Sequence, residues 1–405
     1  MTFSKTWPAA ALAFALAAAP GAYAQKKYDP GASDTEIKIG QTMPYSGPAS
    51  AYGQIGKTHL AYFKMLNEQG GINGRKINLI SVDDGYSPPK TVEMIRKLVE
   101  QDEVLFTFNT LGTPSNSAIH KYMNAKKVPQ LFVATGATKW GDPKEYPWTM
   151  GWQPNYQTEG KIYAKDILAN QPNAKIGVLY QNDDYGKDLL KGLKDGLGAQ
   201  GQKLIVAEAT YEVSDPTVDS QIISLQSSGA DTFINITTPK FSAQAIRKAW
   251  DSGWKPLHIV NNVGASVGSV LVPAGLDKSV GLLTMQYYKD PNDPQWKDDP
   301  AMLEWRGFMG RYYKEGDPKD ASNLYGYLTA QTMVQILKQC GNDLTRENVM
   351  KQAANLKSFK LPLLLPGMAI DTSPTDFYPI EQGQLARFTG QLWQGFGEVI
   401  ATDAR

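Results

Sequence analysis

Short apolar runs alternate along the chain with segments whose apolar residues recur at helical spacing. The short runs predict buried strands, and the recurring spacing predicts amphipathic helices. Through the first part of the chain the two patterns take turns, so that each predicted strand is followed by a predicted helix. The predicted strands lie at 36–42, at 76–82, near 104–108 and from Gln130, and the predicted helices lie at 52–68, at 91–100 and from Thr113.

The same alternation restarts after a segment rich in Pro, Trp and Gly, 140–154, that has no clear period. Helices are then predicted at 156–169, 185–197, 218–227 and 241–250, and strands at 175–180, 204–208, 232–236 and 258–260. Strands separated by helices favour a parallel sheet that is covered on both faces. Two such stretches in succession predict an α/β protein with two doubly wound lobes.

The rest of the chain has a different pattern. A strand is predicted at 280–285, and a loop rich in Pro and Asp leads to helices at 300–313, at 324–339 and from Val349. Because these segments supply too few strands for a third sheet, we expect their helices to pack on the first lobe and the chain to cross between lobes more than once. The expected division is a first lobe of 25–151 plus 284–368 and a second lobe of 152–283 plus 369–405.

Two strand–turn–helix segments carry small hydroxyl residues where a strand ends and a helix begins. In the first, Val104–Ser117, an apolar run leads to a turn at Gly112, and Thr113 followed by Pro114 predicts a helix start. The second, Gln130–Thr138, has a similar apolar run that ends in Thr-Gly-Ala-Thr. Free backbone N–H groups and the positive end of the helix dipole at such a turn suit a carboxylate. Both segments are equally compatible with ordinary turns between a strand and a helix.

The first residues of the chain predict export. Lys5 precedes an apolar run at 8–20 that is short for a membrane span, and the small-x-small pattern at 22–24 fits a cleavage site. We therefore expect a signal peptide over 1–24 and a mature protein in the periplasm that starts near Gln25. A membrane anchor is the alternative for this segment.

Charge and cysteine content exclude several classes of function. The chain has 41 Lys and Arg against 40 Asp and Glu, so its net charge of +1 gives no electrostatic basis for binding nucleic acid or an anionic membrane. Its one cysteine, Cys340, cannot form an internal disulfide or a Cys-based metal cluster. We expect Cys340 to be a small buried apolar residue.

Signatures of the common catalytic sites do not occur in the sequence. The histidines at positions 59, 120 and 258 form no His-Glu-x-x-His motif, and there is no Gly-x-Ser-x-Gly elbow. Gly56–Thr58 has the end of a phosphate-binding loop, but Ala51 stands where that loop needs its first glycine. We therefore expect a protein that is not an enzyme and that has neither a metal nor a cofactor.

Short motifs follow one another along the chain in a recognisable order. They are Ile39-Gly40, Ser46-Gly47-Pro48, Tyr52-Gly53, Glu68-Gln69-Gly70-Gly71-Ile72-Asn73-Gly74-Arg75, Val82-Asp83-Asp84 and Asp184-Tyr185-Gly186. In this order and spacing they resemble the branched-chain amino-acid (leucine/isoleucine/valine) type of periplasmic binding protein. The resemblance implies a type I periplasmic-binding-protein fold, in which two lobes joined by a multi-strand hinge close over a ligand that is delivered to a membrane ABC importer.

The resemblance also implies a set of ligand-binding positions. They are Tyr52, Thr110, Leu111, Gly112, Thr113, Gly136, Thr138, Tyr185, Thr237, Thr238 and Val263. Amino-acid-binding members of the family hold the ligand ammonium with an acidic residue at the position of Val263, and a buried ammonium without a counter-charge is costly. We therefore expect a small apolar or aromatic carboxylate as the ligand, with Trp152 or Tyr287 supplying further flat faces.

Alternatives remain for both the ligand and the role. The ligand could instead be a branched-chain or other hydrophobic amino acid, or an amide. The protein could serve as a periplasmic sensor that presents its ligand to a membrane receptor, because transport and sensing predict the same pocket. The leading expectation is a monomeric solute-binding component that docks on the permease subunits of an importer.

Overall fold

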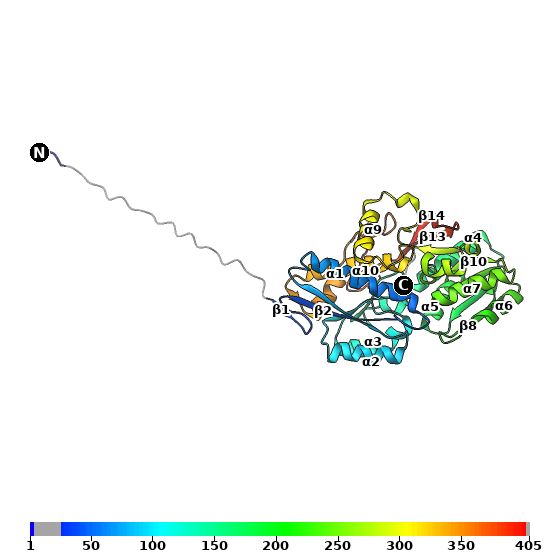
Figure 1. Cartoon of the computed structure of the whole chain (residues 1–405), viewed down its shortest axis with the longest axis horizontal. Coiled ribbons are helices and arrows are strands. Elements are labelled where there is room, and N and C mark those ends of the chain that lie inside the picture. The colour runs from blue at the N-terminus through cyan, green and yellow to red at the C-terminus, as the bar shows by residue number, and fades with distance from the viewer. Residues whose placement is uncertain (4–25, 402–405) are drawn as a thin grey trace.

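The computed structural model describes residues 1–3 and 26–401 and shows two α/β lobes next to each other (Figure 1). The first lobe contains a five-stranded parallel sheet in the order β3-β2-β4-β5-β6. Its strands are β2 Glu36–Met43, β3 Lys76–Asp83, β4 Phe106–Phe108, β5 Gln130–Val133 and β6 Thr149–Gly151. Strands β4 and β5 are buried at every position, as expected for strands that lie between layers of helices.

The second lobe contains a seven-stranded sheet in the order β14-β13-β11-β10-β9-β7-β8. Its strands are β7 Ile176–Gln181, β8 Ile205–Tyr211, β9 Thr232–Ile236, β10 Leu257–Val260, β11 Leu283–Gln286, β13 Gln382–Phe388 and β14 Trp393–Ala401. The strands β7 to β11 are parallel, whereas β13 and β14 add an antiparallel hairpin at one edge. Sequence analysis did not predict β14, because its residues are mostly exposed and form no continuous apolar run.

Helices cover the faces of both sheets (Figure 1). Their bounds are α1 Gly53–Glu68, α2 Pro88–Glu100, α3 Thr113–Lys126, α4 Tyr156–Asn170, α5 Asp184–Gly201, α6 Asp219–Ser227, α7 Pro239–Asp251, α8 Val272–Ala274, α9 Pro300–Tyr312, α10 Ala321–Cys340 and α11 Arg346–Ala353. A short parallel pair, β1 Lys27–Tyr28 with β12 Asp343–Leu344, lies apart from the two sheets.

The late helix α10 packs against α1 of the first lobe. Gly326 permits the close approach, since a Cβ at this position would lie 3.0 Å from Cβ of Thr58. Across the same contact the Thr58 hydroxyl donates to Oδ1 of Asn323 at 3.1 Å, and the His59 ring lies 2.9 Å from the Thr329 hydroxyl. The late helices therefore belong spatially to the first lobe, although most of the second lobe precedes them in the chain.

Within residues 26–401, the chain crosses between the lobes three times, after β6, after β11 and before β13. The expected boundary at residue 284 falls inside β11, whose residues 283–286 all pair with β13 in the seven-stranded sheet. The second crossing therefore follows β11. The remaining boundaries of the expected division stay predictions.

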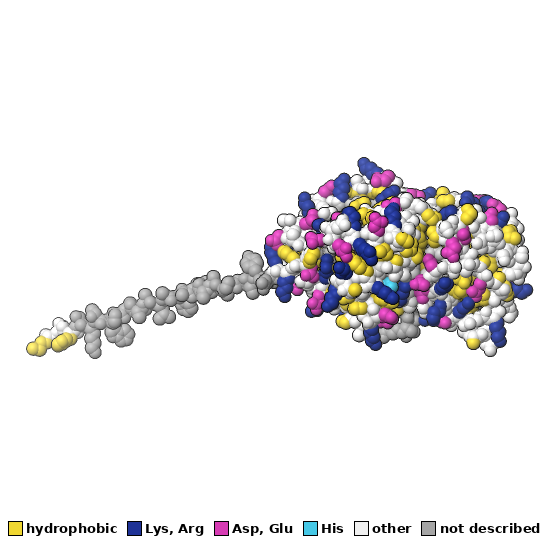
Figure 2. Space-filling view, turned by 90° about the horizontal axis from the view of Figure 1, so that it is seen from below, with side chains coloured by type: hydrophobic (Ala, Val, Ile, Leu, Met, Phe, Trp, Pro, Cys, Tyr) yellow, Lys and Arg dark blue, Asp and Glu magenta, His cyan; other side chains and the backbone are white. Residues whose placement is uncertain are grey.

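Charged side chains of both signs are interspersed over the face shown in Figure 2, in agreement with the net charge of +1. Within residues 1–3 and 26–401, no helix has the length and apolarity needed to cross a membrane. The predicted signal peptide lies outside the described residues from residue 4 onward.

Candidate ligand-binding site

A cavity lies between the two lobes, beyond the carboxyl ends of the parallel strands. Tyr86 follows β3, Leu111 follows β4 and Thr238 follows β9, so the walls come from the edge at which open α/β sheets bind ligands. The space between the walls amounts to about 650 Å³, counting the part that opens to solvent. The lining residues are Tyr52, Ile55, Tyr86, Leu111, Gly112, Thr113, Ala134, Gln153, Tyr156, Tyr185, Thr238, Asn262, Val263, Ser266, Tyr287, Tyr288, Ala321, Ser322 and Tyr325.

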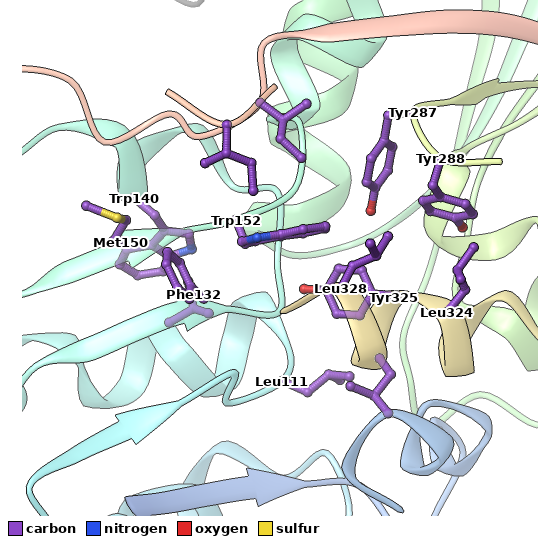
Figure 3. Close-up of a cluster of buried hydrophobic side chains, with 14 of the residues drawn as sticks. Leu111, Phe132, Trp140, Met150, Trp152, Tyr287, Tyr288, Leu324, Tyr325 and Leu328 are labelled. Carbon is purple, nitrogen blue, oxygen red and sulfur yellow. The ribbon is translucent and has the colours of Figure 1, made fainter. Parts of the chain in front are cut away.

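The cavity is rich in tyrosine and poor in charge. Seven of its lining residues are tyrosines, and none of the described lining residues has a charged side chain. The ring centroids of Tyr287 and Tyr288 lie 4.7 Å apart. Trp152 packs behind this wall, with its ring 6.1 Å from that of Tyr287 and 5.4 Å from that of Tyr325 (Figure 3). The site therefore offers flat apolar faces and hydroxyl groups.

The turn between β4 and α3, residues 111–113, forms part of the first-lobe wall, and we call it the first seat. Gly112 has a φ of 99°, a conformation that favours glycine, and a Cβ here would lie 2.6 Å from the ring of Tyr86. Gly112 is the N-cap residue of α3, and it has no side chain that could accept a hydrogen bond from the N–H groups of the first helical turn. The N–H groups of Leu111 and Gly112 donate to the carbonyls of Thr42 and Ala134, both at 3.2 Å. What the turn places next to the cavity is therefore the positive end of the helix dipole and the hydroxyl of Thr113.

The corresponding turn after β5, residues 136–138, is the second seat, and it does not line the cavity. The N–H and the hydroxyl of Thr138 both donate to Oδ2 of Asp188 on α5, at 2.7 and 2.9 Å. The amide of Gln157 donates to the other carboxylate oxygen at 2.8 Å. Burial raises the pKa of Asp188. The second seat thus binds a carboxylate that the second lobe of the protein itself supplies.

Tyr52, the N-cap residue of α1, joins the two lobes. Its hydroxyl donates to the backbone carbonyl of Val263 at 2.9 Å. The neighbouring Asn262 is fixed by two hydrogen bonds, from its N–H to Oε1 of Glu159 at 2.6 Å and from its side chain to the carbonyl of Met285 at 2.7 Å. Burial raises the pKa of Glu159 to about 7. A buried carboxyl group, that of Glu159, therefore holds the lining residue Asn262 in the second-lobe wall of the cavity.

The structure separates the predicted ligand-binding positions into two groups. Those that line the cavity are Tyr52, Leu111, Gly112, Thr113, Tyr185, Thr238 and Val263, and those that do not are Thr110, Gly136, Thr138 and Thr237. The hydroxyl of Thr237 lies 2.6 Å from Oδ1 of Asn235 and 2.6 Å from the hydroxyl of Ser242, within the second lobe. The carbonyl of Thr110 accepts the N–H of Ala134. The contacts of all these positions with a ligand stay predictions.

Several lining residues were not predicted from the sequence. They are Ile55, Tyr86, Ala134, Gln153, Tyr156, Asn262, Ser266, Tyr288, Ala321, Ser322 and Tyr325. Tyr156 and Tyr325 lie in helices, where an aromatic residue is typical of an ordinary core. Tyr86 did carry a signal, because it follows an Asp-Asp-Gly turn and has a positive φ of 61°. Of the two expected flat faces, Tyr287 lines the cavity and Trp152 packs behind it.

The histidines take part in hydrogen bonds inside the lobes. His59 lies 2.9 Å from the amide of Gln41, and burial lowers its pKa to about 3. His258 lies 3.1 Å from the amide of Asn235, and burial lowers its pKa to about 3 as well. No cluster of three or more His, Cys, Asp or Glu side chains that could hold a metal ion occurs within the part of the chain that the structure describes.

Two lobes that enclose an uncharged cavity at their strand ends define a two-lobed small-molecule-binding protein. A family model described as "Periplasmic binding protein" matches residues 36–391. The chain therefore belongs to the periplasmic binding protein family, which is a family of binding proteins.

Relatives and solved structures agree with this assignment. The Leu/Ile/Val-binding protein homolog 1 of Brucella abortus (strain 2308) is 26% identical over 343 residues, which cover 81% of this chain and 85% of that protein. A fatty acid ABC transporter substrate-binding protein from Thermomonospora curvata has a TM-score of 0.79 at 21% identity, with 94% and 96% of the two chains covered. A branched chain amino acid ABC transporter from Thermus thermophilus with bound valine has a TM-score of 0.81 at 16% identity, with 91% and 97% covered.

These comparisons confirm the predicted fold, an α/β protein of two lobes of the type I periplasmic-binding-protein class. They also confirm the resemblance to the branched-chain amino-acid family and, with it, a solute-binding role.

Proposed function

We propose that this chain is the periplasmic solute-binding component of an ABC importer and that it captures a small aromatic or apolar carboxylate between its lobes. The observation that supports a carboxylate ligand is the similarity between the two turns that we call the first and the second seat. The second seat binds the carboxylate of Asp188 with the N–H and the hydroxyl of Thr138, and the amide of Gln157 on α4 adds a third neutral donor. The first seat has a similar sequence and adjoins the cavity, so the positive end of α3 and the hydroxyl of Thr113 are placed to bind the carboxylate of a ligand.

The walls of the cavity favour a flat apolar body for this ligand. Seven tyrosines surround the cavity, and no described acidic residue lines it, so an ammonium group would lack a counter-charge. The family resemblance also implies that Val263 stands where amino-acid-binding members carry an acid. The names of the similar solved proteins include both a fatty acid and a branched-chain amino acid, so the fold alone does not choose between these ligands.

A thermal-shift panel tests the ligand class directly. Benzoate and hexanoate are expected to raise the melting temperature, whereas leucine, valine and benzamide give little or no shift. A ligand at about 100 times its Kd adds about 2.7 kcal/mol to the free energy of unfolding, which such a measurement resolves easily. Benzamide is the matched control, because it keeps the ring and lacks the charge. If leucine or valine gave the largest shift and the simple acids gave none, the proposed ligand class would be wrong.

The proposed role includes partners and a location. A monomer that is exported by the predicted signal peptide at 1–24 and docks on permease subunits fits delivery to an importer. Uptake of labelled benzoate by cells that lack the protein separates transport from sensing. Lost uptake supports transport, and unchanged uptake with a lost response to benzoate supports the sensor alternative.

A further inference from the structure

The hydroxyl group of Tyr185 is buried in the cavity wall without a hydrogen-bond partner among the described residues. The residue is 2% exposed. Buried polar groups nearly always have a partner, and one that lacks it destabilises the folded protein. Because Tyr185 lines the cavity, an atom of a bound molecule is in a position to supply the missing hydrogen bond.

The start of α5 fixes the position of this ring. The carboxylate of Asp183, the N-cap residue, accepts the N–H of Tyr185 at 2.9 Å. The ring packs on Tyr156, with the two ring centroids 5.1 Å apart. The hydroxyl therefore cannot reach a distant partner unless the ring leaves the wall.

Other hydroxyl groups that line the cavity already have partners. Tyr52 donates to the carbonyl of Val263, and the hydroxyl of Ser266 donates to Asp320 at 2.9 Å. The hydroxyl of Thr113 lies 2.6 Å from that of Thr135. Among the described lining residues, Tyr185 is the one whose fully buried side-chain hydroxyl has no hydrogen-bond partner.

We infer that the ligand carries a second, uncharged hydrogen-bonding group that pairs with the Tyr185 hydroxyl. This inference rests on the proposed function, in which the carboxylate occupies the first seat on the opposite lobe. The second group is uncharged because no described lining residue could balance a second charge. The chemical class is thus a hydroxy- or oxo-substituted aromatic carboxylate, which the first lobe holds at one end and the second lobe at the other.

The protonation of Tyr185 agrees with this role. Burial raises the pKa of its hydroxyl well above the ordinary value, and the nearby Glu159 acts in the same direction. The group therefore stays neutral at physiological pH, where it can donate to a carbonyl or a hydroxyl and can also accept from a hydroxyl.

Isothermal titration with matched ligands tests the inference. The panel is benzoate, its three hydroxy isomers and the three methyl isomers of the same shape, measured on the wild type and on Tyr185→Phe. At least one hydroxy isomer is expected to bind the wild type about tenfold or more tightly than both benzoate and its methyl counterpart. Tyr185→Phe should abolish this preference, so that each hydroxy isomer binds the variant no more tightly than its methyl counterpart does. A preference that is absent from the wild type, or that survives in Tyr185→Phe, overturns the inference.

A second measurement needs no ligand. Since the hydroxyl has no partner, Tyr185→Phe should leave the melting temperature of the unliganded protein unchanged or raise it. Tyr163→Phe is the matched control, because its hydroxyl is fully buried and donates to Glu159 at 2.6 Å, so its loss should lower the melting temperature. A comparable fall for Tyr185→Phe overturns the inference. If no acid binds but Tyr185→Phe keeps its stability, the proposed carboxylate is rejected, and the free hydroxyl still supports a ligand with an uncharged polar group.

Discussion

The two seats have similar local sequences and different surroundings. Both follow a buried strand of the first lobe and present a threonine hydroxyl at a turn. The first seat, residues 111–113, adjoins the cavity between the lobes. The second seat, residues 136–138, is filled by the carboxylate of Asp188. The local pattern thus predicts an affinity for carboxylates, and the opposite lobe decides whether that carboxylate belongs to the protein or to a ligand.

The second seat serves as an internal reference for the first. Asp188 shows that a carboxylate can be held here by three hydrogen bonds from Thr138 and Gln157. Hydrogen bonds to a charged acceptor are shorter and stronger than those between neutral groups. Three kinds of substitution test the difference between the seats. The first removes Asp188 from the second seat, the second changes the buried Glu159 in the facing wall, and the third replaces the threonine of each seat.

Emptying the second seat is expected to have the largest effect. Asp188→Ala leaves the N–H of Thr138 and the amide of Gln157 without an acceptor, and it leaves the Thr138 hydroxyl only its longer contact of 3.3 Å with Oδ1 of Asn155. The free energy of unfolding should therefore fall by roughly 4 kcal/mol. Urea unfolding measures this loss. The control is Asp195→Ala on the same helix, which removes only an exposed ion pair with Lys191 and should have a small effect.

Added formate should restore part of the stability of Asp188→Ala, and should do so more than for the wild type, because it replaces the missing carboxylate. A loss below about 1 kcal/mol, within the usual range for surface substitutions, would show that the second seat does not depend on its acid.

The buried acid in the facing wall, Glu159, should make stability depend on pH. Burial raises its pKa from 4.5 to about 7, so the folded protein binds this proton more tightly than the unfolded chain. The resulting stabilisation is fully present below pH 4.5 and is lost as the pH rises through 7, a change on the order of 3 kcal/mol. Glu159→Gln keeps an acceptor for Asn262 and removes the titration.

The measurement is the free energy of unfolding of wild type and Glu159→Gln between pH 4.5 and 8. Burial also raises the pKa values of Asp183 and Asp188, which act in the same direction, so only the difference between the two proteins reports on Glu159. Parallel pH profiles for the two proteins would contradict the prediction.

The matched threonine substitutions should have the smallest effects and the clearest contrast. Thr113→Val, in the first seat, is expected to weaken benzoate binding by about 2 kcal/mol because a hydroxyl next to the bound carboxylate is lost. Thr138→Val removes one hydrogen bond to Asp188 and should lower the free energy of unfolding by about 1.5 kcal/mol, with a smaller effect on affinity. Titration and urea unfolding of both variants give the comparison. Equal effects of the two variants on affinity would remove the distinction between the seats.

Much of the fold could be predicted because it follows from local patterns. Alternating apolar runs and helical spacing identify the strands and helices of both lobes, with shifts of a few residues at their ends. Strand β14 could not be found in this way, because its residues face solvent at most positions and form no apolar run, although it pairs with the neighbouring strand β13. The predicted lobe boundary at 284 lies too early because β11 pairs along its whole length with β13 from the end of the chain, a contact that no local pattern indicates.

The site was less predictable than the fold. The first seat and Tyr185 carry their information in short motifs, whereas Tyr156 and Tyr325 become cavity walls only when the two lobes meet. Thr138 shows the limit most clearly, because its partner Asp188 lies 50 residues further along the chain. Local sequence predicts which chemical group a turn can bind, but it does not predict which residue or ligand the fold places beside that turn.

The three chain crossings have a mechanical consequence. Two rigid bodies that are tied at three points can still rotate about an axis near the ties, whereas sliding and twisting would stretch at least one connection. If the lobes close over the proposed ligand by such a rotation, a single angle describes the motion. The time a captured molecule stays inside depends on how steeply the energy rises along that angle, and substitutions in the crossing segments would tune residence time without touching the molecule.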